Sequence, residues 1–117
     1  MLSRLMQNVP HISGALVSSA DGLPVASALS HHQPQPTAAV AASSLALGQR
    51  LVELLGNRPL DEFVVRSADG FVVIYSLGSD GSLTVLARPE ANLGLLHIQA
   101  RRVLSELAAI VDEPQLI

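Results

Sequence analysis

Runs of small and β-branched residues alternate with Asp-Gly pairs along this 117-residue chain. Asp-Gly pairs at 21–22, 69–70 and 80–81 each stand between two such runs. This arrangement is a strong hairpin signal, and tight turns join antiparallel neighbours. The pattern therefore predicts a five-stranded antiparallel sheet. Its predicted strands span residues 12–19, 23–29, 60–67, 71–77 and 83–88.

Apolar residues at helical spacing predict three helices, over residues 2–8, 37–55 and 92–111. Residues 30–36, SHHQPQP, predict a loop, so Thr37 is expected to cap the second helix and Gly56 to follow its end. The element order is α-β-β-α-β-β-β-α. Because both faces of residues 71–75 are apolar, helices should cover both faces of the sheet. The expected fold class is a small α/β (α+β) sandwich, with residues 1–117 forming one domain.

The middle helix is too apolar for one contact surface. Its stripe and the flanking apolar positions cover about 180° of the helix, whereas packing on a sheet needs about 100°. We expect it to pack on its own sheet and on a second subunit; a fully buried helix of a monomer is the alternative. The stripe is Val40, Leu47, Leu51, Leu54 and Leu55, flanked by Ala41, Leu45 and Val52, with Ser43, Gln49, Arg50 and Glu53 on the polar side.

The last helix has a simpler pattern. One face, expected to lie on the sheet, carries Leu96, Ala100, Val103, Leu107 and Ile110. Arg102 and Glu106 are spaced to pair on the solvated side, where such a pair contributes only a few tenths of a kcal/mol.

Composition excludes several classes of partner. The net charge is −3, all seven basic residues are Arg, and no basic patch is visible, which argues against nucleic-acid binding. No apolar stretch is long enough for membrane insertion and no leader is evident, so a cytoplasmic protein is expected. With 49% hydrophobic and only 15% charged residues, part of the surface should meet another chain.

Catalytic motifs are missing from the sequence. It contains no Gly-x-Ser-x-Gly elbow, no phosphate-binding loop with lysine and no Cys. His31-His32 lacks further ligands for a metal, and His97 is interpreted as a hydrogen-bonded histidine at the core boundary rather than a general base. We therefore expect no enzyme activity, no cofactor and no metal.

Three segments resemble the Roadblock family, also called dynein light chain seven. Residues 14–27, GALVSSADGLPVAS, are similar to its opening hairpin. Residues 42–48, ASSLALG, resemble its central helix with a mid-helix Gly, and residues 92–102, NLGLLHIQARR, resemble its final helix. The element order also agrees, so the resemblance implies a Roadblock-like (profilin-like) fold.

The resemblance further implies a homodimer. In the family, the third strands of two subunits pair into one continuous sheet, and the central helices lie together on one face. In this chain that strand is residues 60–67. An unpaired apolar edge strand would promote aggregation, which favours the same arrangement. The expected dimer interface is Leu45, Leu51, Val52, Phe63, Val64 and Val65.

Bacterial family members similar to MglB are partners and activators of a Ras-like gliding GTPase, which they bind through the paired central helices. The resemblance therefore implies a small Ras-like GTPase as partner, and the contact residues expected here are Ser43, Gln49, Arg50 and Glu53. Arg50 is equally well interpreted as a solvated helix residue. A scaffold subunit that leaves nucleotide turnover unchanged is the main alternative, and a small-ligand sensor is a third.

Overall fold

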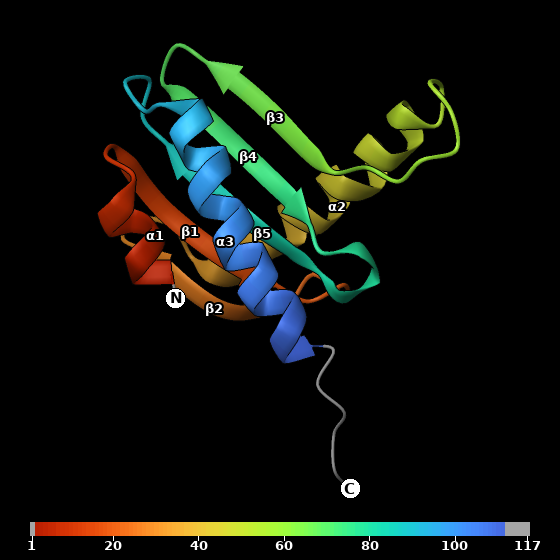
Figure 1. The fold of residues 1–117 in the computed structure, drawn as a ribbon, viewed down its shortest axis with the longest axis horizontal. Coiled ribbons are helices and arrows are strands. Elements are labelled where there is room, and N and C mark those ends of the chain that lie inside the picture. The colour runs from red at the N-terminus through yellow and green to blue at the C-terminus, as the bar shows by residue number, and fades with distance from the viewer. Residues whose placement is uncertain (1, 112–117) are drawn as a thin grey trace, which may run out of the picture.

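The five-stranded antiparallel sheet is confirmed in the computed structural model, which describes residues 2–111 and the side chains of residues 2–107 (Figure 1). The strands lie in the order β2-β1-β5-β4-β3, with β1 and β5 adjacent near the centre and β2 and β3 at the two edges. All pairings are antiparallel. The bounds are β1 (Ile12–Ser18), β2 (Pro24–Leu29), β3 (Glu62–Ser67), β4 (Gly70–Ser76) and β5 (Ser82–Ala87), with a short 3-10 turn at Gly78–Asp80 before β5.

Helices cover both faces of the sheet, as expected. In Figure 1, α1 (Leu2–Asn8) and α3 (Leu93–Val111) lie side by side in front of the sheet, and α2 (Pro34–Val52) lies behind it. We call these two sides the α3 face and the α2 face. The larger core is on the α3 face, where aliphatic side chains of the three central strands meet both helices. It includes Leu5, Val9, Val17, Val73, Tyr75, Leu83, Val85, Leu96, Ala100 and Val103.

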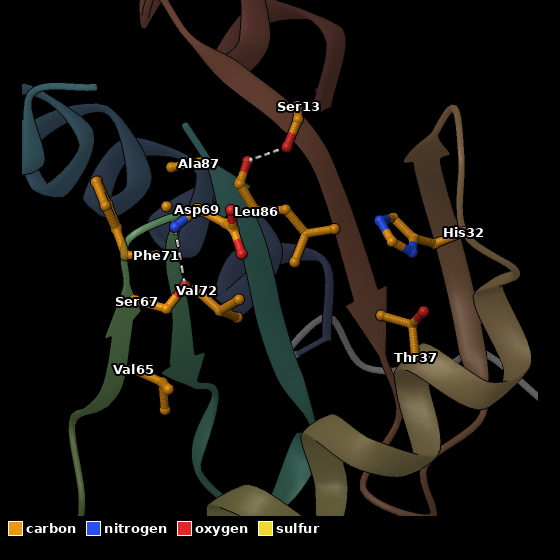
Figure 2. A pocket seen from close by; sticks show the side chains of 11 residues that line it. Ser13, His32, Thr37, Val65, Ser67, Asp69, Phe71, Val72, Leu86 and Ala87 are labelled. Atoms are coloured by element: carbon orange, nitrogen blue, oxygen red, sulfur yellow. Dashed lines mark hydrogen bonds between the residues drawn. The ribbon is translucent and has the colours of Figure 1, made fainter. Parts of the chain in front are cut away.

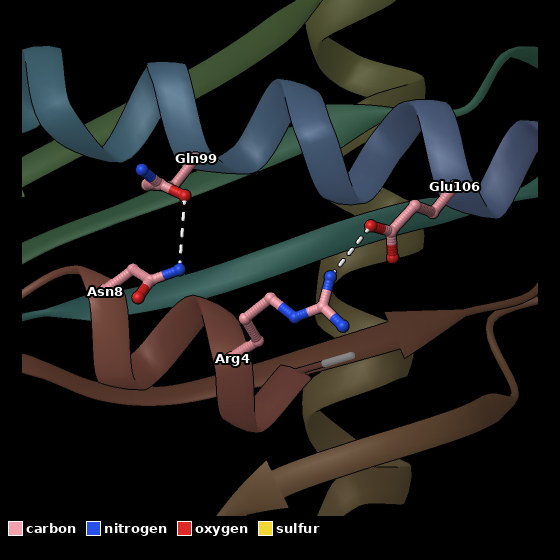
Figure 3. Close-up of polar contacts among 4 residues, drawn as sticks. All are labelled: Arg4, Asn8, Gln99 and Glu106. Atoms are coloured by element: carbon pink, nitrogen blue, oxygen red, sulfur yellow. Dashed lines mark hydrogen bonds and ion pairs between the residues drawn. The ribbon is translucent and has the colours of Figure 1, made fainter.

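The predicted inner face of α3 is confirmed where its side chains are described. Leu96, Ala100 and Val103 are buried and Leu107 packs against them, whereas the side chain of Ile110 lies outside the described residues. Glu106 does not take the partner expected for it. Its carboxylate lies 3.2 Å from the guanidinium of Arg4 on α1, so it links the two helices instead of pairing with Arg102 (Figure 3).

Helix α2 begins three residues earlier than predicted. The prediction of a loop through residue 36 was wrong, because Pro34 and Pro36 lie in the first turn, where no backbone N–H is needed for intrahelical bonds. Thr37 is therefore inside the helix, and its hydroxyl donates to the Gln33 carbonyl at 2.8 Å. At the other end α2 stops at Val52 rather than residue 55.

The side of α2 that contacts the sheet is made of small residues. Ala38, Ala41 and Gly48 are buried against the sheet and the segment leading into β3. A Cβ atom at Gly48 would lie 2.6 Å from the Phe63 ring, so glycine permits this close approach. The larger side chains of Val40, Leu47 and Leu51 are consequently left exposed to solvent.

Candidate interaction surface

The outer side of α2 is an apolar surface exposed to solvent. Val40, Leu47 and Leu51 are 65%, 57% and 52% exposed, and we call these three residues the apolar face of α2. Leu54 and Leu55, in the turn after the helix, are more exposed still. Contiguous exposed aliphatic side chains of this kind mark a site of protein association.

Two adjoining hollows extend this apolar face across the sheet toward β3. The first, of about 260 Å³, lies between Val40 on the helix and Val72 and Ile74 on β4. The second, of about 350 Å³, shares Thr37 and Val72 with the first and reaches Val65 on β3. Figure 2 shows this second hollow, with His32 and Thr37 on one side, Val65 and Ser67 on the other, and Val72 and Leu86 between them. The sheet is therefore incompletely covered between α2 and β3.

Strand β3 adds an open edge to this surface. On one side it pairs with β4 from Glu62 to Ser67, and on the other it has no neighbour among the described strands. Val64 and Val65 are 43% and 50% exposed. An edge of six residues with exposed valines favours pairing with another strand.

The expected dimer residues lie on α2 and on the β3 edge. Leu51, Val64 and Val65 are exposed, whereas Leu45, Val52 and Phe63 are half-buried within the chain itself. Phe63 packs against Gly48, so its ring supports α2 as well as bordering the edge. Strand β3 begins at Glu62 rather than at residue 60, because buried Leu60 belongs to the connection from α2.

The expected GTPase-contact residues do not share one role. Ser43, Arg50 and Glu53 are exposed on α2 or at its end. Gln49 instead has an internal partner, because its side-chain oxygen accepts a hydrogen bond of 2.8 Å from the N–H of Leu60. This bond fixes the connection between α2 and β3, a role that the sequence pattern did not reveal.

A polar cluster beneath α3 was also only partly anticipated. The Tyr75 hydroxyl lies 2.7 Å from Nδ1 of His97, and a carboxylate oxygen of Glu62 lies 3.2 Å from the same nitrogen. The two rings meet edge to face, with centroids 5.7 Å apart. His97 is thus a hydrogen-bonded boundary histidine, as interpreted, but its partners come from β3 and β4 and are distant in sequence.

The pKa of Tyr75 is raised above its ordinary value of about 10, first because the hydroxyl is buried and second because Glu62 is negative, with Arg101 opposing. Folding therefore favours the neutral phenol. This contribution to stability is complete below pH 10 and is lost as the pH rises further. The chain has one Tyr, no Cys and no Lys, so few other side chains titrate in that range.

We expect the free energy of unfolding, measured by urea titration, to fall as the pH rises above about 10. Tyr75→Phe should cost about 1 kcal/mol at pH 7 through the lost hydrogen bond but flatten this alkaline decline. An equally steep decline in Tyr75→Phe would assign the alkaline instability to another group.

The described residues contain neither a cluster of metal-binding side chains nor a membrane-spanning helix. No three His, Asp or Glu side chains gather there to hold an ion. His32 borders the second hollow, on the loop before α2. None of the helices from residue 2 to residue 111 is long and apolar enough to cross a bilayer.

The sequence and the fold both resemble those of known proteins. The sequence model of the Roadblock/LC7 domain family matches residues 1–87, which is most of the chain. The chain belongs to the Roadblock/LC7 family. Among curated proteins none matches the sequence significantly.

Solved structures of other Roadblock/LC7 proteins share the fold over nearly the whole chain. A Roadblock/LC7 domain from Streptomyces avermitilis superposes with a TM-score of 0.86 at 26% identity, covering 93% of this chain and 92% of its own. MglB from Myxococcus xanthus gives 0.85 at 19% identity, covering 95% and 91%. The gliding protein MglB from Thermus thermophilus gives 0.85 at 21% identity, covering 97% and 87%. At these identities the two MglB structures establish similarity of fold.

Proposed function

We propose that this Roadblock/LC7 chain is a non-enzymatic, homodimeric regulator of a small Ras-like GTPase, which it binds through paired α2 helices. The observation that carries the proposal is the continuous apolar surface formed by the apolar face of α2, the adjoining hollows and the β3 edge. In a dimer joined at β3, the second α2 is placed to cover the hollows of the first chain. The polar ends of both helices stay accessible to a further partner.

Three lines of evidence support this function. Roadblock/LC7 proteins are known as adaptors or regulators rather than enzymes, and MglB proteins are among the structural neighbours. Another structural neighbour, at 22% identity, is an MglB with a tetrameric arrangement, which supports the proposal that this chain also assembles into an oligomer. The exposed apolar surface of this chain offers the contacts that protein association requires.

The proposal is tested by light scattering after size exclusion, using the full chain with a Ras-like GTPase from the same genome. The GTPase is loaded with either GDP or a non-hydrolysable GTP analogue. We expect a dimer that retains only the GTP-analogue form. A dimer that binds both forms equally would instead be a scaffold, and a monomer that binds neither would contradict the whole proposal.

Arg50 is the residue that we expect to contact the GTPase most strongly. It is exposed in the last turn of α2, and hydrogen bonds to a charged group contribute about 1.5–3 kcal/mol. Arg50→Ala should therefore raise the dissociation constant for the GTPase about tenfold or more, while the dimer mass stays the same. Arg102 on α3 is also an exposed arginine, so Arg102→Ala is the matched control and should bind the GTPase normally. Unchanged affinity in Arg50→Ala would remove Arg50 from the contact.

A further inference from the structure

The backbone groups on the open side of β3 belong to alternate residues. The N–H of Ser76 donates to the Asp61 carbonyl at 3.0 Å, which places residue 61 among those bonded toward β4. Residues that exchange such bonds alternate along an antiparallel ladder. Glu62, Val64 and Arg66 therefore direct their N–H and C=O groups away from β4, toward the open edge.

The side chains of these three residues also share one face. In the register with β4, Glu62 lies opposite Tyr75, Val64 opposite Val73, and Arg66 opposite Phe71. Tyr75, Val73 and Phe71 all belong to the core on the α3 face. The edge therefore presents a negative, an apolar and a positive side chain, in that order, on the α3 face. Phe63 and Val65 lie on the α2 face.

This order is complementary to itself when reversed. In a two-fold symmetric antiparallel pair, one residue faces its own copy across the axis, and the residues on either side exchange partners. We infer that two copies of this chain pair through β3 with Val64 on the two-fold axis, so that Glu62 faces Arg66 of the partner subunit in two symmetric ion pairs. The inference rests on the homodimer proposed above and specifies how its strands align.

The same alignment also matches the α2 face. With Val64 on the axis, Phe63 lies opposite the partner's Val65, an aromatic–β-branched pair of the kind that stabilises adjacent strands. Shifting the two-fold axis by one residue in either direction removes this complementarity. With Val65 on the axis, Val64 would face Arg66 of the partner subunit. With Phe63 on the axis, Val65 would face the partner's Asp61.

The proposed ion pairs connect the dimer edge to the interior. Glu62 already contacts His97, which contacts the buried Tyr75 hydroxyl. The guanidinium of Arg66 lies over the Phe71 ring, 4.9 Å from its centroid. Each charged side chain is thus held at the edge by a neighbour in its own chain and extends the polar cluster beneath α3 to the partner.

Single cysteine variants test the alignment directly, because the chain has no cysteine of its own. In the inferred register, the two Cα atoms at position 64 lie about 5.5 Å apart, within disulfide range. The two atoms at position 65 are offset by two residues along the strands, beyond the limit of about 7 Å. Val64→Cys should therefore form a covalent dimer on oxidation at least about tenfold faster than Val65→Cys. Val25→Cys, exposed on the opposite edge, measures random collision.

The possible outcomes test the strand register and the homodimer independently. Faster cross-linking of Val65→Cys, or no variant exceeding Val25→Cys while light scattering still shows a dimer, would overturn the register and leave the homodimer standing. A monomer by light scattering in the unmodified chain would overturn the homodimer itself.

Charge-reversal variants provide a second test, in which the dissociation constant of the dimer is measured. Glu62→Arg and Arg66→Glu each place like charges opposite one another and should raise this constant roughly tenfold. The double variant restores opposite charges across the axis and should return to within about threefold of the unmodified chain, although its contact with His97 is lost. If the two effects simply multiply, the residues do not face each other.

Discussion

Replacing Val64 with Arg is expected to raise the dissociation constant of the dimer at least about a hundredfold. The Val64 side chain is 43% exposed in the single chain, so the folded subunit can accept a longer side chain there. On the two-fold axis, however, two guanidinium groups would face each other and lose water without gaining a partner. An uncompensated buried charge costs about 3–5 kcal/mol. Analytical ultracentrifugation should show monomers with unchanged circular dichroism.

The matched control is Val25→Arg on the other edge strand. Val25 is 68% exposed on β2, so the same change in charge and volume should leave the dimer intact. If Val64→Arg remains a dimer at the same concentration as the unmodified chain, β3 is not the junction. If both variants dissociate, the effect belongs to net charge rather than to position.

The second large effect is expected from Gly70→Ala, at the start of β4. Gly70 has a φ of +140°, which side-chain-bearing residues rarely adopt, and an added Cβ would meet the Ala87 carbonyl oxygen on β5. That oxygen belongs to the backbone of a paired strand, so it cannot move without disturbing the sheet. Backbone strain and overpacking together should lower the free energy of unfolding by about 3 kcal/mol or more.

Gly56→Ala is the control for this substitution. No atom lies within 4 Å of a Cβ at position 56, and its φ is not in the left-handed region. Its stability should stay within about 0.5 kcal/mol or rise slightly through the lower entropy of the unfolded chain. Equal stability of the two variants in urea titration would show that the close approach of Gly70 to β5 is not needed.

The sheet could be predicted from the sequence because its signals are local. Each Asp-Gly turn joins two neighbouring strands, and the hairpins that follow need no knowledge of the rest of the chain. The start of α2 was misplaced because Pro34 and Pro36 were interpreted as loop residues. Proline is equally compatible with a first helical turn, and the contacts that decide between the two lie elsewhere in the fold.

The composition of α2 correctly indicated more apolar surface than one sheet can cover, but it did not show which side faces inward. A hydrophobicity pattern ranks Leu47 and Leu51 above Ala38 and Gly48, yet the small residues are the ones that lie on the sheet. Close approach of Gly48 to Phe63 decides this orientation, and it depends on tertiary packing.

The polar contacts of the site were the least predictable part. Gln49 was assigned to the polar side of the helix because its spacing places it there, but its partner is a backbone N–H eleven positions along the chain. The cluster of Glu62, Tyr75 and His97 joins a strand edge, a strand interior and a helix. No sequence spacing brings such residues together, so only the fold reveals them.

The pairing of β1 with β5 bears on how the protein is made. These two strands share the centre of the sheet, although one lies near the beginning of the chain and the other shortly before the last helix. On the ribosome, the β1–β2 hairpin can form early, but its inner edge has no neighbour until β5 has emerged. Leu5 and Val9 likewise cannot be buried until Leu96 on α3 has been synthesised. Such non-local contacts slow folding. A nascent chain therefore exposes the unpaired edge of β1 during synthesis, and it is most prone to aggregate at that stage.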